Sequence, residues 1–249
     1  MTGRASCALV TGAASGIGQA YAEHLARIGY DLILVGSRVD RLERRARQLI
    51  NDHTVQVQVL PADLESEDGI RRVANRIESG PPIDILVNSA GSPARGRLSH
   101  PDPDALGGTV RVNITAMSRL CHSAMIRMLN RGSGSVINIA PAAFAILLQE
   151  RHDNGAFRSF TVAFTRHLQM EAEGTGVRVQ LLIPGVVDTD IPAIKESDLR
   201  SLPSWAVITP AKLVGASLRS LALGELICCP FFPTIRDWES YVNASGAAP

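Results

Sequence analysis

The sequence contains no run of 18 apolar residues, the length from which a membrane-spanning helix is expected. The apolar stretch near its start is too short for a signal peptide. The sequence also lacks an excess of either charge, because 25 Lys and Arg residues stand against 24 Asp and Glu residues. A surface that binds nucleic acid or an acidic membrane needs a clear basic excess. We therefore expect a cytoplasmic protein with no nucleic-acid or membrane partner.

Cysteines are few, and they show neither metal-ligand spacing nor a disulfide pattern. Cys7 and Cys121 lie inside apolar runs, so we expect them to be small core residues. Cys228 and Cys229 are adjacent in a strand-like segment, so their side chains should point to opposite faces. We expect no metal ion, and free cysteines of this kind fit the reducing cytosol.

The 249 residues suit one α/β domain whose core needs no disulfides. Short apolar runs, typical of buried strands, alternate with segments of helical periodicity. The strand-like runs are residues 6–12, 31–37, 55–64, 83–91, 134–140 and 176–185, with a further one around Cys228 and Cys229. The helical segments are residues 15–29, 39–50, 104–131 and 154–174. This order predicts an α/β fold: a single doubly wound, Rossmann-like domain with about seven parallel strands and helices on both faces.

Details of the helical segments support this interpretation. Gly29 is the expected end of the first helix. One stripe of the long helix contains Val110, Ile114, Met117, Cys121, Met125 and Met128. The arginines between Arg38 and Arg47 alternate with acidic residues and are expected mostly on a solvated helix face.

We find no linker, repeat or low-complexity tract, so residues 1–249 are expected to form one domain. Residues 5–190 should form the cofactor and reaction core, and residues 190–242 the substrate pocket and C-terminal segment. Residues 243–249 are expected to be a disordered tail. The second segment contains Trp205, Phe231, Phe232 and Trp238. They suggest an apolar small-molecule substrate, and packing in the core would explain them equally.

The stretch TGAASGIG, residues 11–18, directly follows the first predicted strand and opens the first predicted helix. Gly12 permits a tight turn, Gly16 lets the backbone approach a pyrophosphate, and Gly18 allows close packing of helix and strand. The start of the helix offers unpaired N–H groups and the positive end of its dipole. The stretch therefore predicts a phosphate-binding turn of a nucleotide site.

With NSAG at 88–91 and PGVVDTD at 184–190, this turn makes residues 5–190 resemble the short-chain dehydrogenase/reductase family. The resemblance implies cofactor contacts by Thr11, Gly12, Ser15, Gly16, Ile17, Gly18, Asp63, Leu64, Asn88, Ala90, Gly91, Pro184, Gly185, Val187 and Thr189. It also implies that Asp63 contacts the adenine, and that Val187 and Thr189 contact the nicotinamide amide. Asn113 matches the asparagine that holds a proton-relay water. The family pairs its two long helices across a dimer axis, so we expect a homodimer or homotetramer.

The end of the second predicted strand indicates which nucleotide binds. An acidic residue there would accept a hydrogen bond from the adenosine 2′-hydroxyl of NAD, and none is present. Ser37 and Arg38 could instead contact a 2′-phosphate, with Arg38 as a charged fork, or Arg38 could be merely solvated. The sequence favours NADP over NAD.

The family's reacting residues are a serine, a tyrosine and a lysine, and the matching positions here are Pro141, Asn154 and Arg158. The family's tyrosine supplies the proton in carbonyl reduction, and its lysine lowers the pKa of that tyrosine and holds the nicotinamide ribose. Asn154 can form hydrogen bonds but is no acid near neutral pH. Arg158 can hold ribose hydroxyls but is always charged. Losing a general acid costs about 10²–10⁴ in rate.

Other side chains near these positions have two interpretations each. His152 is a candidate acid or base, or a solvated loop residue before a helix. Asp153 is the expected N-cap of the helix from Asn154. Ser92 and Arg95 either line the cleft or belong to a loop, and Asp188 and Asp190 are caps or cleft carboxylates. We take Asn113, His152, Asn154 and Arg158 as the candidate catalytic residues.

Three functions remain open from the sequence. The first is an atypical oxidoreductase that transfers hydride to an imine, an enone or another activated substrate. The second is non-redox catalysis, such as isomerisation, elimination or cyclisation, on the same scaffold. The third is an inactive nucleotide-binding protein or a subunit that partners an active homologue. The helical stripe of Phe157, Phe160, Phe164 and Leu168 fits either such an interface or the core.

Overall fold

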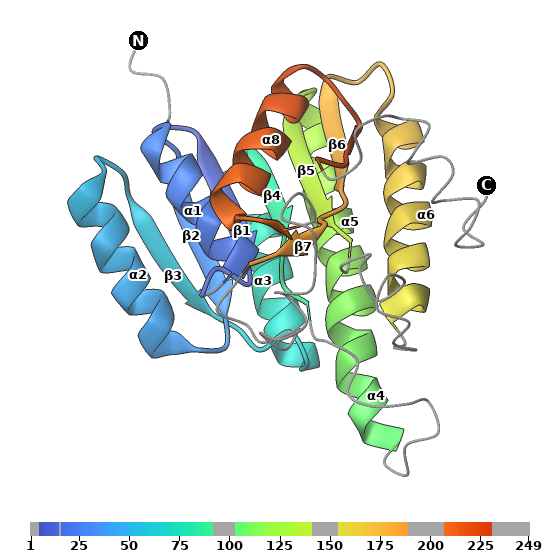
Figure 1. Ribbon diagram of the computed structural model, residues 1–249, viewed down its shortest axis with the longest axis horizontal. Helices are drawn as coiled ribbons and strands as arrows, with labels where there is room; N and C mark the ends of the chain where they lie inside the picture. The colour runs from blue at the N-terminus through green and yellow to red at the C-terminus, as the bar shows by residue number, and fades with distance from the viewer. Residues whose placement is uncertain (1–4, 15, 92–102, 141–153, 189–206, 231–249) are drawn as a thin grey trace.

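The computed structural model describes residues 5–14, 16–91, 103–140, 154–188 and 207–230. Its main sheet has seven strands in the order β3-β2-β1-β4-β5-β6-β9, and all neighbours are parallel. The strands are β1 (Cys7–Thr11), β2 (Asp31–Gly36), β3 (Val57–Pro61), β4 (Ile85–Asn88), β5 (Gly134–Ile139), β6 (Val177–Leu182) and β9 (Ile227–Cys228). The prediction of one doubly wound, Rossmann-like sheet of about seven parallel strands is confirmed (Figure 1).

Helices connect these strands. They are α1 (Gly16–Arg27), α2 (Val39–Asp52), α3 (Glu67–Ser79), α4 (Pro103–Val110), the π-helix η1 (Arg111–Ala116), α5 (Met117–Arg131), α6 (Asn154–Ala172) and α8 (Pro210–Ala222). Two short strands, β7 (Val186–Val187) and β8 (Val207–Ile208), pair apart from the main sheet. Among the described residues, no helix is long and apolar enough to cross a membrane.

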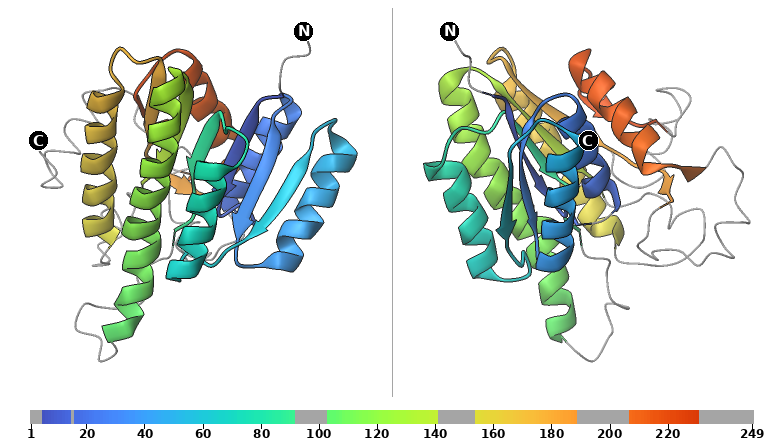
Figure 2. Two further views of the ribbon diagram at one scale, coloured as in Figure 1. Left: turned by 180° about the vertical axis from the view of Figure 1, so that it is seen from behind. Right: turned by 90° about the vertical axis from the view of Figure 1, so that its left-hand side faces the viewer.

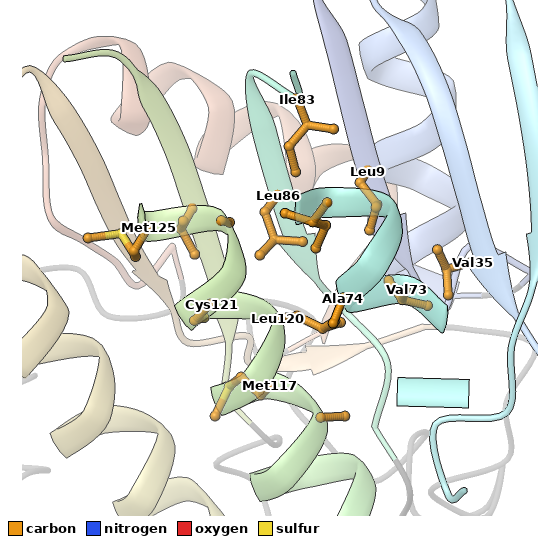
Figure 3. Packing of buried hydrophobic residues seen from close by; sticks show 14 of the residues in the cluster. Leu9, Val35, Val73, Ala74, Ile83, Leu86, Met117, Leu120, Cys121 and Met125 are labelled. Atoms are coloured by element: carbon orange, nitrogen blue, oxygen red, sulfur yellow. The ribbon is translucent and has the colours of Figure 1, made fainter. Parts of the chain in front are cut away.

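The sheet separates two hydrophobic clusters. On one face, apolar residues of α3, α5 and α6 pack on strand residues such as Leu9, Leu86 and Val136. On the other face, α1, α2 and α8 pack on the alternate strand residues, among them Val10, Val87 and Ile137. Figure 2 shows these helical layers on the two sides of the sheet, and Figure 3 shows α3 and α5 packed over it. Strands buried on both faces explain why their sequences are continuous apolar runs.

Local signals set the ends of several helices. Gly29 has φ +88°, and its N–H donates to Ala26 O at 2.9 Å while the N–H of Tyr30 donates to Leu25 O at 3.0 Å. This pair of bonds is a glycine-terminated helix end, so the predicted role of Gly29 is confirmed. The hydroxyl of Ser66 accepts the N–H of Gly69 and caps α3. Thr209 caps α8 in the same way, with a proline in its first turn.

The structure adds two helices that the sequence analysis did not single out, α3 and α8. The signal for α3 was present, because Ile70, Val73, Ala74 and Ile77 follow the i, i+3, i+4, i+7 pattern after a serine cap. The predicted helix over 104–131 is α4, η1 and α5 in succession. Four residues of its predicted stripe, from Met117 to Met128, are buried.

The two adjacent cysteines point to opposite faces, as predicted. Cys228 packs in the cluster under α1 and α8, and Cys229 packs against the cluster that contains Val162 and Leu181. The described cysteines are all free thiols. The expectation that the arginines between Arg38 and Arg47 lie mostly on a solvated face is confirmed, because Arg38, Arg41, Arg44 and Arg47 are exposed. Arg45 is the exception among them, since it is largely buried against Glu23 of α1.

Candidate functional site

The turn after β1 has a shape that only glycine permits. Gly12 has φ +66°, and a Cβ on it would lie 3.0 Å from the backbone of Ala90. A Cβ on Gly18 would lie 2.4 Å from the carbonyl oxygen of Gly12, closer than real Cβ atoms approach. The first turn of α1 therefore sits directly on the end of β1. Ser15 lies outside the described residues.

The start of α1 suits an anion. Gly16 begins the helix with φ +58°, and Ile17 is half-buried against the cluster beneath α1. The first turn contains no acidic side chain, so nothing of that kind repels a phosphate there. Unpaired N–H groups and the helix dipole favour negative charge at this position. The residues present therefore fit the pyrophosphate of a dinucleotide.

The hydroxyl of Thr11 joins β1 to the end of β4. It donates to Val87 O at 3.3 Å and accepts the N–H groups of Ser89 and Ala90, both at 3.0 Å. A hydroxyl can donate one bond and accept two, so Thr11 is fully satisfied. This bonding brings the glycine turn and the NSAG segment, which the sequence placed at one cofactor, into contact.

The NSAG segment also meets the long helical segment. A Cβ on Gly91 would lie 3.4 Å from Oδ1 of Asn113. Asn113 is buried and belongs to η1, where the helix widens to π geometry. Single π turns inside helices occur frequently at functional sites. Sequence periodicity did not reveal this turn, because a six-residue π segment barely disturbs a stripe that continues on both sides.

Asn88 lies at the same strand end, but its side chain points into the protein. Its amide nitrogen donates to Oδ1 of Asn138 at 2.8 Å and to Sγ of Cys121 at 3.2 Å. Burial raises the pKa of the Cys121 thiol to about 12, against the smaller opposing effects of its hydrogen bonds with Asn138 and Asn88. The thiol therefore stays protonated and donates to Asn138. A contact of Asn88 with a cofactor stays a prediction.

Helix α6 contains two of the three positions that the sequence analysis matched to the family's reacting residues. Asn154 is its first residue, and Arg158 follows one turn later with only 6% of its surface exposed. The helix packs against η1 and against β6. A buried guanidinium on α6 and a buried amide on η1 therefore belong to the same region. Pro141 and His152 lie outside the described residues, as does the side chain of Asn154.

The residues predicted to select the nucleotide lie on the surface after β2. Ser37 and Arg38 are exposed, and Arg38 immediately precedes α2 without capping it. Asp63 is exposed after β3, and its Oδ1 accepts the N–H of Glu65 at 2.9 Å. The side chain of Leu64 is buried in the core, and a contact of this residue with a cofactor stays a prediction. β3 and β2 are adjacent in the sheet, so these segments follow neighbouring strand ends.

The segment after β6 completes the described part of the site. Pro184 and Gly185 are buried, and Val187 is half-buried where β7 pairs with β8. Asp188 is exposed, and its N–H donates to Ile208 O at 3.1 Å. Predicted residues that lie outside the described part of the chain are Ser92, Arg95, Asp153, Thr189, Asp190, Trp205, Phe231, Phe232 and Trp238.

A family model for short chain dehydrogenases matches residues 6–199. The chain belongs to the short-chain dehydrogenase family. A relative of 33% identity is an uncharacterized oxidoreductase of Staphylococcus aureus, aligned over 75% of this chain and 80% of the relative.

Two solved structures have a fold similar to that of this chain. A short-chain dehydrogenase from Sphingobium yanoikuyae in complex with NADPH superposes with a TM-score of 0.86 at 29% identity, over 97% of this chain and 94% of the other. The bulky-bulky ketone specific alcohol dehydrogenase from Comamonas testosteroni gives a TM-score of 0.84 at 27% identity, over 98% and 93% of the two chains. The chain thus belongs to an oxidoreductase family, and one similar structure of that family has NADPH bound.

Proposed function

We propose that this chain binds NADP(H) at the carboxyl end of its sheet and transfers hydride to an activated small-molecule substrate without the family's proton relay. The observation that supports binding is the glycine turn after β1. Only glycine fits at positions 12 and 18 of this turn, and α1 begins there without an acidic residue. The similar enzyme from Sphingobium yanoikuyae has NADPH bound. The proposal assigns the remaining roles to residues that surround this turn.

Each part of the nucleotide has a proposed holder. The start of α1 takes the pyrophosphate, and Ser37 with Arg38 takes the 2′-phosphate. Arg158 donates hydrogen bonds to the nicotinamide ribose, and Asn113 holds a water molecule beside it. When bound, NADPH supplies the hydride for the reaction.

The substituted positions limit the substrate. A guanidinium remains charged at all relevant pH values, so Arg158 holds a position but transfers no proton. Without a general acid, the reaction loses about 10²–10⁴ in rate, equivalent to about 3–5 kcal/mol. An iminium carbon accepts hydride and becomes an amine with no further proton. An enone accepts hydride at its β-carbon, and the enolate then takes a proton from water or from His152. Such substrates are therefore the proposed class.

Nucleotide binding is the first test. The purified protein is titrated with NADPH, NADP, NADH and NAD by calorimetry, and NADPH oxidation is then followed with imines and enones. We expect micromolar binding with a preference for the 2′-phosphate, followed by turnover of one substrate class. Binding without turnover would favour an inactive nucleotide-binding subunit, and activity independent of the cofactor's oxidation state would favour non-redox catalysis. No binding of any nucleotide would refute the proposal.

The 2′-phosphate preference is tested with Arg38→Asp. The change replaces a positive charge with a negative one, so NADPH should bind at least about tenfold more weakly, or about 1.4 kcal/mol. NADH affinity should be unchanged or higher. Arg47→Asp is the matched control, because it makes the same charge change on exposed α2 about 14 Å further along the helix. Equal NADPH affinity in Arg38→Asp and the control would contradict the assignment.

A further inference from the structure

A buried polar cluster lies beneath the proposed site, between the two helices that contain Asn113 and Arg158. Asn88 ends β4 and Asn138 is the penultimate residue of β5, and the two are register partners in the sheet. The amide nitrogen of Asn88 donates to Oδ1 of Asn138 at 2.8 Å. The thiol of Cys121, on α5, donates to the same oxygen at 3.3 Å. Oδ1 of Asn138 thus accepts both hydrogen bonds.

The other end of the Asn138 amide reaches α6. Its nitrogen donates to Oγ1 of Thr165 at 3.1 Å, and that hydroxyl donates to Thr161 O at 2.6 Å. Asn138 and Thr165 are both fully buried. The hydrogen bond therefore joins the centre of the sheet to α6 where water cannot replace it.

The cluster is connected to the site by helical spacing. Thr165 follows Arg158 by seven residues, two helical turns, so both lie on the same face of α6. Cys121 follows Asn113 by eight residues along η1 and α5. Asn138 precedes Pro141 by three residues. Three members of the cluster, Thr165, Cys121 and Asn138, therefore lie on the same segments of chain as Arg158, Asn113 and Pro141, respectively.

The geometry points to Asn138 and Thr165 as positioning residues that fix α6 on the sheet and thereby set the place of Arg158. Apolar contacts of α6, such as those of Phe157, Val162 and Leu168, tolerate small rotations and shifts of the helix. A buried hydrogen bond between two side chains permits one register. Gln169, one turn further from Arg158, also donates side-chain bonds from α6, to Val179 O at 3.1 Å and to Leu226 O at 2.8 Å.

This inference rests on the proposed function, because it concerns the ribose contact of Arg158. The test uses Thr165→Val, which keeps the shape of the side chain and removes its hydroxyl. Thr161→Val is a close control. Thr161 is also buried on α6, and its hydroxyl donates to the carbonyl four residues earlier, Phe157 O at 2.9 Å. The described structure gives Thr161 no bond to a side chain of the sheet, so the pair isolates the bond from Asn138.

Two ligands separate positioning from loss of stability. NADPH contains the nicotinamide ribose that Arg158 is proposed to hold, whereas 2′,5′-ADP contains only the adenosine half of the cofactor. We expect Thr165→Val to bind NADPH about tenfold more weakly and 2′,5′-ADP as the wild type does. Thr161→Val should bind both ligands normally. In an Arg158→Ala background, Thr165→Val should cause no further loss, because both changes remove the same contact.

A second pair of variants covers a failure of Thr165→Val to fold. Thr165→Ser and Thr165→Ala differ by one oxygen atom, and only the alanine variant should lose NADPH affinity. Normal NADPH affinity in Thr165→Val and Thr165→Ala would overturn the inference, as would equal losses for both ligands. Wild-type protein that binds no nucleotide would instead refute the proposed function and the inference with it. If Arg158→Ala lost NADPH affinity and the Thr165 variants did not, this inference would be refuted and the proposed function would stand.

Discussion

At the scale of single residues, the site is defined by distances that leave no room for a side chain. Gly12 and Gly18 touch neighbouring backbone, not flexible side chains, so the structure cannot relax by rotating a neighbour. Thr11 adds a fixed bond to the next strand end. The protein's own contacts therefore set the positions of Thr11, Gly12 and Gly18, and preorganisation of this kind lowers the cost of binding.

Replacement of Gly18 tests this close packing of the turn. In Gly18→Ala, the new methyl group would lie 2.4 Å from Gly12 O, and overpacking of this kind costs about 1–3 kcal/mol. Gly215→Ala is the control, because Gly215 is also a buried helical glycine, and its nearest neighbour is the flexible end of Arg219 at 3.5 Å. We expect the control to be neutral or more stable by up to about 1 kcal/mol. Urea unfolding measures both. Equal urea midpoints for the two variants would mean that the turn accommodates the added methyl group.

At the scale of elements, polar contacts on the face opposite to α5 hold the helices together. The hydroxyl groups of Tyr21 and Ser217 meet at 2.5 Å between α1 and α8, fully buried. Burial raises the pKa of Tyr21 well above its usual range, so its phenol stays neutral in this contact. Glu23 contacts Arg45 at 2.6 Å and His53 at 2.9 Å, which joins α1 to α2. These contacts fix helices that the apolar core alone would leave free to shift.

The Glu23 contacts should weaken in acid. Burial by itself would raise the pKa of the Glu23 carboxyl, but the hydrogen bond from His53 and the charge of Arg45 outweigh it and lower that pKa. A lowered pKa stabilises the fold above the ordinary carboxyl range, and this stabilisation is lost as pH falls through the folded-state pKa. Glu23 is 37% exposed, so we expect Glu23→Gln to cost about 1 kcal/mol or less near pH 7.

Thermal unfolding at several pH values measures this effect. The difference between wild type and Glu23→Gln should shrink as pH falls below the ordinary carboxyl range and vanish once the pH is below the lowered pKa of Glu23 in the folded state. Glu173→Gln, a change at an exposed glutamate just after α6, serves as the control and should show no such trend. A difference between wild type and Glu23→Gln that stays constant from pH 7 down to the acid limit of folding would show that the charge of Glu23 is not responsible.

At the scale of the whole molecule, the site lies where the strand order reverses. β1 has β2 on one side and β4 on the other, so the crossovers from β1 leave in opposite directions. Ligands of open α/β sheets bind at the carboxyl ends of strands at such a point. The glycine turn and the NSAG segment follow the two strands at this point. A ligand there contacts segments from both halves of the sheet.

Nucleotide binding should therefore stabilise the whole fold. A ligand at 100 times its Kd that binds only the folded state adds about 2.7 kcal/mol. For a domain of this size, that corresponds to a rise in Tm of about 5–10 °C. Thermal unfolding with and without saturating NADPH measures the shift. Arg38→Asp at the same NADPH concentration should show a smaller rise. An unchanged Tm at a saturating concentration would contradict binding at this position.

Much of the fold and of the glycine turn was predictable from the sequence, because these features depend on local patterns. Alternating apolar runs and helical periodicities fixed the parallel sheet, and the glycines at 12, 16 and 18 fixed the turn that follows β1. Gly29 and the opposite orientations of Cys228 and Cys229 were predictable for the same reason. In each case the feature follows from residues within one element and its immediate neighbours.

The tertiary structure alone decided which polar residues meet. Asn88, Cys121, Asn138 and Thr165 come from four elements far apart in the sequence, and each looks like an isolated polar or small residue in an apolar run. The π turn at Asn113 and the burial of Arg45 likewise depend on neighbouring helices. Periodicity reports that a residue is buried, but its partner depends on how distant segments cross. The amino-acid sequence therefore determined the fold and the glycine turn after β1, whereas the packing of distant segments determined which residues form the buried polar cluster.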